Sequence, residues 1–254
     1  MIKIDKDLNT VPNSLNNRKT ITRRNTLIRD DRYHDTKEFN QRFKQTDIKE
    51  QLNVIYNSKC AYCEEKITKT NADNLRDKEE QSHTIEHYRP KSKYPWLAYS
   101  WDNLLWCCVT CNKNKDNNFN IENEKVMYEE SFLDSIHKSN LLYNDVEKPK
   151  MIHPEFEDIT DELRFDETGK IYSEDDRVKY TIACCAIDRL YLQTERKKVL
   201  DDLLNKIKSN LSESKPIQSI VSDFQATSLH DTTQYKAFRK WIISDDNLSS
   251  LIVK

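Results

Sequence analysis

Glycine is almost absent from this sequence: Gly169 is the only one among 254 residues. Loops that cradle a nucleotide phosphate, such as G-x-x-x-x-G-K, need several glycines because the backbone must approach the phosphate closely. The sequence therefore excludes a loop of this kind. We expect that the chain does not bind ATP by itself.

A strong net charge is also missing. Lysine and arginine total 41 and aspartate and glutamate total 43, which leaves a formal charge of −2 at pH 7. This balance excludes a globally basic nucleic-acid-binding protein. Any contact with phosphates must come from local basic patches or from a bound metal ion.

Long apolar runs are absent as well. No stretch reaches the roughly eighteen apolar residues of a membrane-spanning helix, and the first residues, MIKIDKDLNT, lack the apolar core of a signal peptide. The chain nevertheless contains seven cysteines, which in a reducing compartment are more often metal ligands than disulfides. We therefore expect a soluble cytoplasmic protein with no membrane contact.

Four of the cysteines form two pairs with a two-residue gap, Cys60/Cys63 and Cys108/Cys111. A tight turn with this spacing aims two thiolates at one ion, and two such pairs complete a tetrahedral zinc site. The bland alternative is four free thiols. Cys107 lies outside the spacing, and strand periodicity turns it away, so we interpret it as a small buried apolar residue.

Harder ligands lie between and after the two cysteine pairs. Glu86 stands beside His87, and Asn112 directly follows Cys111. Oxygen donors suit a catalytic cation such as Mg²⁺ or Mn²⁺, and an imidazole suits a general base. The alternatives are a structural histidine at position 87 and a helix cap at position 112.

The order of these motifs resembles the zinc-stapled HNH endonucleases. The shared pattern is Cys-x-x-Cys, then Glu-His-x-x-Pro-Lys, then Asn-Leu-x-x-x-Cys-x-x-Cys-Asn-x-x-Lys, over roughly a quarter of the chain. The resemblance implies a ββα-metal unit. Its first strand carries Glu86 and His87, Asn103 and Leu104 lie on the second, and a helix beginning near Cys111 presents Asn112.

The resemblance also implies roles for these residues in phosphodiester hydrolysis. His87, with a pKa expected near 6.5, would activate water, and Glu86 and Asn112 would hold the catalytic cation. Asn103 would brace the loop behind the histidine. Arg89, Lys91 and Lys115 are the expected contacts to nucleic acid. His83 shares a strand face with His87 and could meet substrate, although its spacing does not demand it.

The fold predicted from these patterns is α+β and mainly helical. We expect a basic arm over residues 1–35, an HNH core with zinc knuckles over residues 36–120, and a mostly helical region for packing and partner binding over residues 121–254. Helices are predicted from hydrophobic periodicity, and Gly169 marks the turn of a small hairpin. The predicted helices cover residues 36–58, 131–142, 176–211 and 233–243, residues 64–82 are predicted to be a loop, and residues 162–173 form the hairpin.

The second half resembles a narrower group, the HNH subunits of Septu anti-phage systems, which are also found attached to retrons. The resemblance rests on the run from Pro149 through FDETGKI to a helix with Arg189 and Arg196. It implies an ATPase partner of the SMC or ABC type, with a retron reverse transcriptase and its msDNA as further candidates. We expect the last aromatic helix, with Tyr235, Phe238 and Trp241, to take part in docking that partner.

The sequence thus predicts an HNH endonuclease subunit in phage defence, cutting phage or host DNA. Two alternatives stay open. One is an effector that cuts tRNA or other RNA in a retron-linked system, and the other is a catalytically inactive, zinc-stapled assembly subunit. No residue pattern separates a DNA substrate from an RNA substrate.

Overall fold

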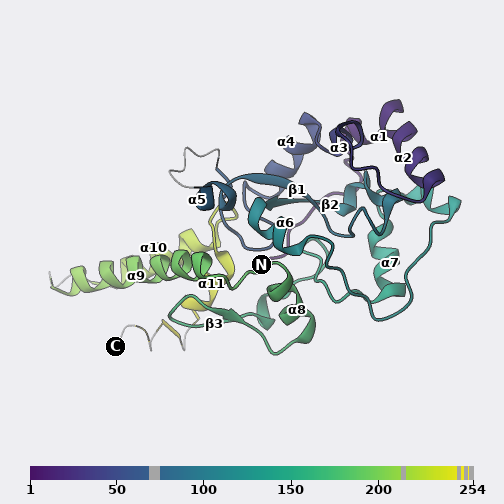
Figure 1. Cartoon of the computed structure of the whole chain (residues 1–254). Coiled ribbons are helices and arrows are strands. Elements are labelled where there is room, and N and C mark those ends of the chain that lie inside the picture. Colours follow the sequence, from purple (N-terminus) through teal and green to yellow (C-terminus); the bar gives the residue numbers. More distant parts are fainter. Residues whose placement is uncertain (69–74, 213–215, 245–246, 249–250, 252–254) are drawn as a thin grey trace.

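The computed structural model describes residues 1–68, 75–212, 216–244, 247–248 and 251, with the backbone alone for residues 75–77 (Figure 1). In chain order, the helices and strands are α1 (Asn13–Asn16), α2 (Arg18–Asp30), α3 (Lys37–Phe43), α4 (Thr46–Ile55), α5 (Leu75–Glu80), β1 (His83–His87), β2 (Leu104–Cys108), α6 (Val109–Lys115), α7 (Ser139–Glu147), β3 (Arg164–Phe165), β4 (Ile171–Tyr172), α8 (Asp176–Cys184), α9 (Leu190–Ser212), α10 (Gln218–Leu229) and α11 (Lys236–Ile242). Short 3₁₀ turns lie at Pro95–Leu97, Trp101–Asn103, Glu130–Ser135 and Thr160–Glu162.

The antiparallel hairpin of β1 and β2 lies at the centre of the molecule, with α6 continuing directly from β2 (Figure 1). The register pairs Glu86 with Leu105 and His87 with Leu104. All five residues of β2 are buried, because the N-terminal helices and the C-terminal region cover the hairpin from different sides (Figure 1). The predicted mainly helical fold with small antiparallel sheets is confirmed.

Residues 1–35, predicted to be a basic arm, contain α1 and α2, which pack against the body. Arg24 is buried and donates to the carbonyl of Tyr99 at 3.3 Å. The side chain of Asn17 caps α2 by accepting from the backbone N–H of Thr20 at 2.9 Å. Such a cap satisfies one of the free donors at a helix start. Part of the basic cluster therefore holds the fold together.

The single helix predicted for residues 36–58 is two helices, α3 and α4, separated at Lys44 and Gln45. Phe43 and Ile48 are both buried, yet a five-residue step in one straight helix would turn their side chains about 140° apart. The break lets both side chains enter the core. It also places Lys44 beside the predicted catalytic histidine, as described below.

The loop predicted for residues 64–82 contains α5, and residues 69–74 of it lie outside the described residues. Of the helix predicted at residues 131–142, the first part is a 3₁₀ turn, and α7 begins only at Ser139. The long helix predicted from residue 176 is divided into α8 and α9, with Ala186 at a positive φ of 48° between them. The sequence did not indicate α10.

The predicted hairpin around Gly169 is confirmed as β3 and β4. Gly169 has a φ of 81°, and a Cβ there would lie 2.3 Å from the carbonyl oxygen of Gln193. Only glycine fits this turn, because both the left-handed backbone and the close approach exclude a side chain.

Helix α11 forms within the predicted range, but two of the three aromatic residues expected to dock a partner are buried. Tyr235 and Phe238 are each 1% exposed, and Phe238 stacks on Trp241 with ring centroids 5.5 Å apart. Tyr235 and Phe238 therefore belong to the core and do not face a partner, whereas Trp241 is partly exposed. A role of this helix in docking remains a prediction. Within the described part of the chain, no helix is both long enough and apolar enough to span a bilayer.

Candidate active site and metal centre

His87 lies at the end of β1, buried against the N-terminal helices. The ring of Phe43 meets its imidazole edge-on, with centroids 4.6 Å apart and planes at 85°. Its Nε2 lies 3.0 Å from the carbonyl oxygen of Ala98. Because a carbonyl only accepts, Nε2 carries the proton and Nδ1 is the ring nitrogen that can accept one.

Burial lowers the pKa of His87 to about 3, and the nearby positive charge of Lys91 adds to this effect. The expectation of a pKa near 6.5 is therefore wrong, because it assumed an imidazole in water. The consequence is a histidine that is neutral at neutral pH. A neutral imidazole has a lone pair that can accept a proton, but a pKa this low makes it a weak base until the negative charge of a bound phosphate raises the pKa.

Glu86 points to a buried ammonium group. Its Oε1 accepts from Nζ of Lys115 at 2.7 Å, and the same Nζ donates to the carbonyl of His87 at 2.9 Å. Burial raises the pKa of the Glu86 carboxyl, and the Lys115 charge opposes that rise. Lys115 is fully buried, so it orients Glu86 and the end of β1. Its predicted role as a contact to nucleic acid is not compatible with this position.

Asn112 lies in α6 and lines one hollow of about 600 Å³ together with Glu86 and His87. The strand–helix connection brings these side chains together, because α6 packs on both strands of the hairpin. Carboxylate and amide oxygens are the donors that Mg²⁺ prefers. Glu86 and Asn112 are therefore suited to hold a hard divalent cation next to His87.

Asn103 is buried and connects three backbone groups of the loop behind His87. Its Oδ1 accepts from the backbone N–H of Arg89 at 2.7 Å, and its Nδ2 donates to the carbonyls of Arg89 at 3.0 Å and Leu97 at 3.1 Å. The side chain thus fixes the turn that follows β1. This geometry matches the bracing role expected from the motif.

Arg89 is also buried, which contradicts its predicted contact with nucleic acid. Its guanidinium donates to Oε2 of Glu147 at 2.8 and 3.0 Å, to Asn144 at 3.0 Å, and to Asn140. These partners lie on α7, so Arg89 joins that helix to the end of β1. Because the guanidinium is fully buried and has an internal partner on each nitrogen, a phosphate in solvent cannot reach it.

Lys91 is half-buried and lines the hollow, as expected for a phosphate contact. The structure adds Lys44, Lys113 and Tyr33 to the same lining. Lys44 is exposed at the end of α3, and Nζ of Lys91 lies 4.9 Å above the Tyr33 ring. Sequence patterns missed Lys44 and Tyr33, because both lie before the recognisable motif.

His83 occupies another environment. Its ring stacks on Trp106, with centroids 4.5 Å apart and planes at 9°, and both side chains line a different hollow, on which Lys49 and Asn53 also lie. The shared strand face therefore does not bring His83 into the hollow of His87.

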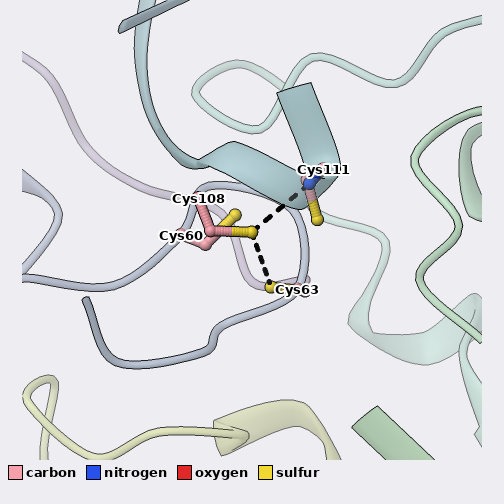
Figure 2. A group of neighbouring side chains, drawn as sticks. All are labelled: Cys60, Cys63, Cys108 and Cys111. Carbon is pink, nitrogen blue, oxygen red and sulfur yellow. Dashed lines mark hydrogen bonds between the residues drawn. The ribbon is translucent and has the colours of Figure 1, made fainter. Parts of the chain in front are cut away.

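The four predicted zinc cysteines, Cys60, Cys63, Cys108 and Cys111, come together at the base of the hairpin, and all four are buried (Figure 2). Their sulfur atoms lie within 4.8 Å of one another, and those of Cys63 and Cys108 are 3.9 Å apart. Zn–S bonds of about 2.3 Å in a tetrahedron place the sulfurs about 3.8 Å apart. The cluster therefore has both the donor chemistry and the spacing that zinc requires.

Besides belonging to the sulfur cluster, Cys108 caps the start of α6. Its Sγ accepts from the backbone N–H of Cys111 at 3.4 Å, so this cysteine pair also caps the helix (Figure 2). Cys107 lies closer to the cluster than strand periodicity predicts, with its Sγ 3.6 Å from that of Cys60. It is fully buried, as expected of a small apolar side chain.

The segment that contains these residues is similar to a known protein family. Residues 60–118 match the family described as HNH endonuclease. Over these residues the chain is similar to an HNH endonuclease domain. The HNH domain includes both cysteine pairs, Glu86, His87 and Asn112, whereas Phe43 and Lys44 come from outside it.

Two curated relatives extend the similarity beyond the HNH domain. The chain is 35% identical to the Septu protein PtuB of Bacillus mycoides over 187 residues, which cover 66% of this chain and 56% of PtuB. It is 24% identical to the Septu protein PtuA of the same strain over 211 residues, which cover 77% of this chain and 27% of PtuA. The chain thus spans about half the length of PtuB and about a quarter of PtuA. The predicted resemblance to HNH endonucleases and to the Septu subunit is confirmed.

Proposed function

We propose that the chain is a metal-dependent HNH endonuclease subunit that hydrolyses phosphodiester bonds in an anti-phage defence complex. The observation that carries the proposal is the meeting of Glu86, His87 and Asn112 in one hollow within the HNH domain. The similarity to PtuB supports the defence context. DNA is the substrate that we propose.

His87 acts as the general base. Its Nε2 proton is held by the carbonyl of Ala98, so Nδ1 accepts the proton of the attacking water. Phe43 and the Asn103 brace fix the ring and the turn that follows it. A base that is already held in a fixed orientation accelerates proton transfer, because little reorganisation is needed at the moment of reaction.

Glu86 and Asn112 would hold Mg²⁺ or Mn²⁺, which would supply Lewis-acid stabilisation to the leaving 3′-oxygen. Lys115 fixes the Glu86 carboxylate through Oε1. Lys91 and Lys44 hold the phosphates on the open side of the hollow. Hydrolysis in this manner leaves a 5′-phosphate and a 3′-hydroxyl.

We further propose that the chain works with an ATPase-type partner. The support is the similarity to two proteins that both carry the Septu name. The chain has a single glycine and hence no glycine-rich phosphate loop. A partner would therefore supply any nucleotide-driven step.

The experiment is a nuclease assay on plasmid DNA and on tRNA, with the ATPase-type partner present. We expect His87→Ala to fold normally and to cleave on the order of a hundred- to ten-thousandfold more slowly. The matched control is His83→Ala, which removes a histidine from the same strand but from another hollow, and its rate should stay close to that of the wild type. Undiminished cleavage by His87→Ala would contradict the assignment. A wild-type protein that binds DNA and tRNA but cleaves neither would favour the inactive assembly subunit.

A further inference from the structure

Arg189 contacts three of the four clustered cysteines from outside the HNH domain. Its Nη1 donates to Sγ of Cys111 at 3.4 Å, and its Nη2 lies 3.8 Å from Sγ of Cys108 and 3.9 Å from Sγ of Cys63. Arg189 directly precedes α9, far along the chain from the knuckles. The guanidinium plane therefore covers one side of the sulfur cluster.

The orientation of Arg189 is fixed by partners on both sides. Nε donates to Oε1 of Glu80 at 2.7 Å, and Nη2 forms an ion pair with the same carboxylate. Nη1 also donates to the carbonyl of Ala186 at 3.0 Å. Glu80 is the last residue of α5 and its side chain is 1% exposed. A side chain held in this way cannot turn away from the sulfurs without breaking a buried ion pair.

The chemistry of a four-thiolate zinc site explains why an arginine should face it. One Zn²⁺ and four thiolates carry a net charge of −2, and burial makes such a charge costly. N–H donors that point at thiolate sulfur delocalise part of that charge. The guanidinium brings a permanent positive charge to the cluster, because arginine does not lose its proton in proteins.

We propose that Arg189 is an outer-shell partner of the zinc centre and couples zinc binding to the docking of the segment between α8 and α9. In the zinc-loaded protein its N–H groups meet thiolates, whereas after zinc loss they meet neutral thiols, which are weaker acceptors. Coupling of this kind is reciprocal: Arg189 strengthens zinc binding as much as zinc strengthens the docking. Because α9 and α10 extend away from the rest of the molecule (Figure 1), zinc fixes the base of this projecting pair.

The first test measures zinc affinity of the full chain by competition with a chromophoric chelator. We expect Arg189→Gln to bind zinc about 10–100-fold more weakly, the usual loss when an outer-shell partner is removed. The matched control is Arg177→Gln. Arg177 lies on the neighbouring helix α8, and its ion pair with Glu157 is lost in this variant, but its guanidinium contacts no sulfur. Its zinc affinity should equal that of the wild type.

The second measurement separates a direct contact from general destabilisation. In the Co²⁺-substituted protein, loss of N–H···S bonds should move the sulfur-to-cobalt charge-transfer band to longer wavelength in Arg189→Gln and leave it in place in Arg177→Gln. If Arg189→Gln fails to fold, Arg189→Lys keeps the charge without the guanidinium fork, and it should show the same shift with an intermediate affinity. Wild-type affinity with an unmoved band in the folded variant would overturn the proposal. A wild-type chain that binds no zinc would overturn it too, whatever its nuclease activity.

Discussion

Burial decides which basic side chains near His87 are able to meet a phosphate. Arg89 and Lys115 are fully buried and paired with Glu147 and Glu86. Lys91, in contrast, is half-buried and lines the hollow. A buried cation that already has a carboxylate partner contributes to the arrangement of the site. An exposed one remains available to the substrate.

The lysines of the hollow give a prediction at the scale of single residues. Lys91→Ala and Lys44→Ala should each weaken nucleic-acid binding and reduce the slope of log K against log salt concentration by about one, because each removes one phosphate contact. The free energy of unfolding should change by no more than about 0.5 kcal/mol. Fluorescence anisotropy over a salt series measures the slope. Lys208→Ala, an exposed lysine on α9, is the control and should bind as the wild type does; equal slopes for all three variants would contradict the assignment.

At the scale of elements, the site depends on two local features. One is the break between α3 and α4, and the other is the start of α6. The break brings Phe43 onto the ring of His87 and Lys44 to the hollow. Cys108 joins β2 to α6 and caps the helix that presents Asn112. One short helix therefore joins the cysteine cluster to the proposed catalytic cation site.

This connection predicts different outcomes for two adjacent cysteines. Cys108→Ser removes a zinc ligand and the cap of α6, so zinc content and solubility should fall together. Cys107→Ala removes a buried thiol that lies outside the ligand set, and the protein should keep a full equivalent of zinc. Elemental analysis of the two purified variants measures this. Full zinc in Cys108→Ser, or its loss in Cys107→Ala, would reverse the assignment.

At the scale of the whole molecule, the first residues connect the HNH domain to the region that follows it. Nζ of Lys6 donates to the carbonyls of Trp101 and Leu104, each at 2.7 Å, and to Oε1 of Glu155 at 3.0 Å. The backbone N–H of Ile4 donates to the carbonyl of Pro154 at 2.8 Å. The first residues are thus part of the core rather than a free arm.

The buried pair of Lys6 and Glu155 gives a prediction for global stability. Lys6→Met should lower the free energy of unfolding by about 3–5 kcal/mol, because it leaves Glu155 buried without its cation. The double variant with Glu155→Gln should be less destabilised than the sum of the two single variants, since residues in contact couple. Urea denaturation followed by circular dichroism measures all three. Additive effects would show that the two side chains do not interact in the folded protein.

The sequence by itself determined the chemistry of the site. The spacing of Cys60/Cys63 and Cys108/Cys111 identified the cysteine cluster, and the motif around Glu86, His87 and Asn112 identified the HNH domain. Such motifs are readable because a turn or a strand–helix connection fixes the relative positions of nearby residues. The hairpin at Gly169 was predictable for the same local reason.

The tertiary structure decided what depends on residues far apart in the chain. The burial of Arg89 and Lys115, the pKa of His87, the contact of Phe43 with His87 and the approach of Arg189 to the cysteines all arise from packing between segments. Charge in a sequence does not reveal whether a side chain meets water or a carboxylate. Solvation and long-range partners are set only when the chain is folded, and they determine which residues of a recognised motif face the substrate.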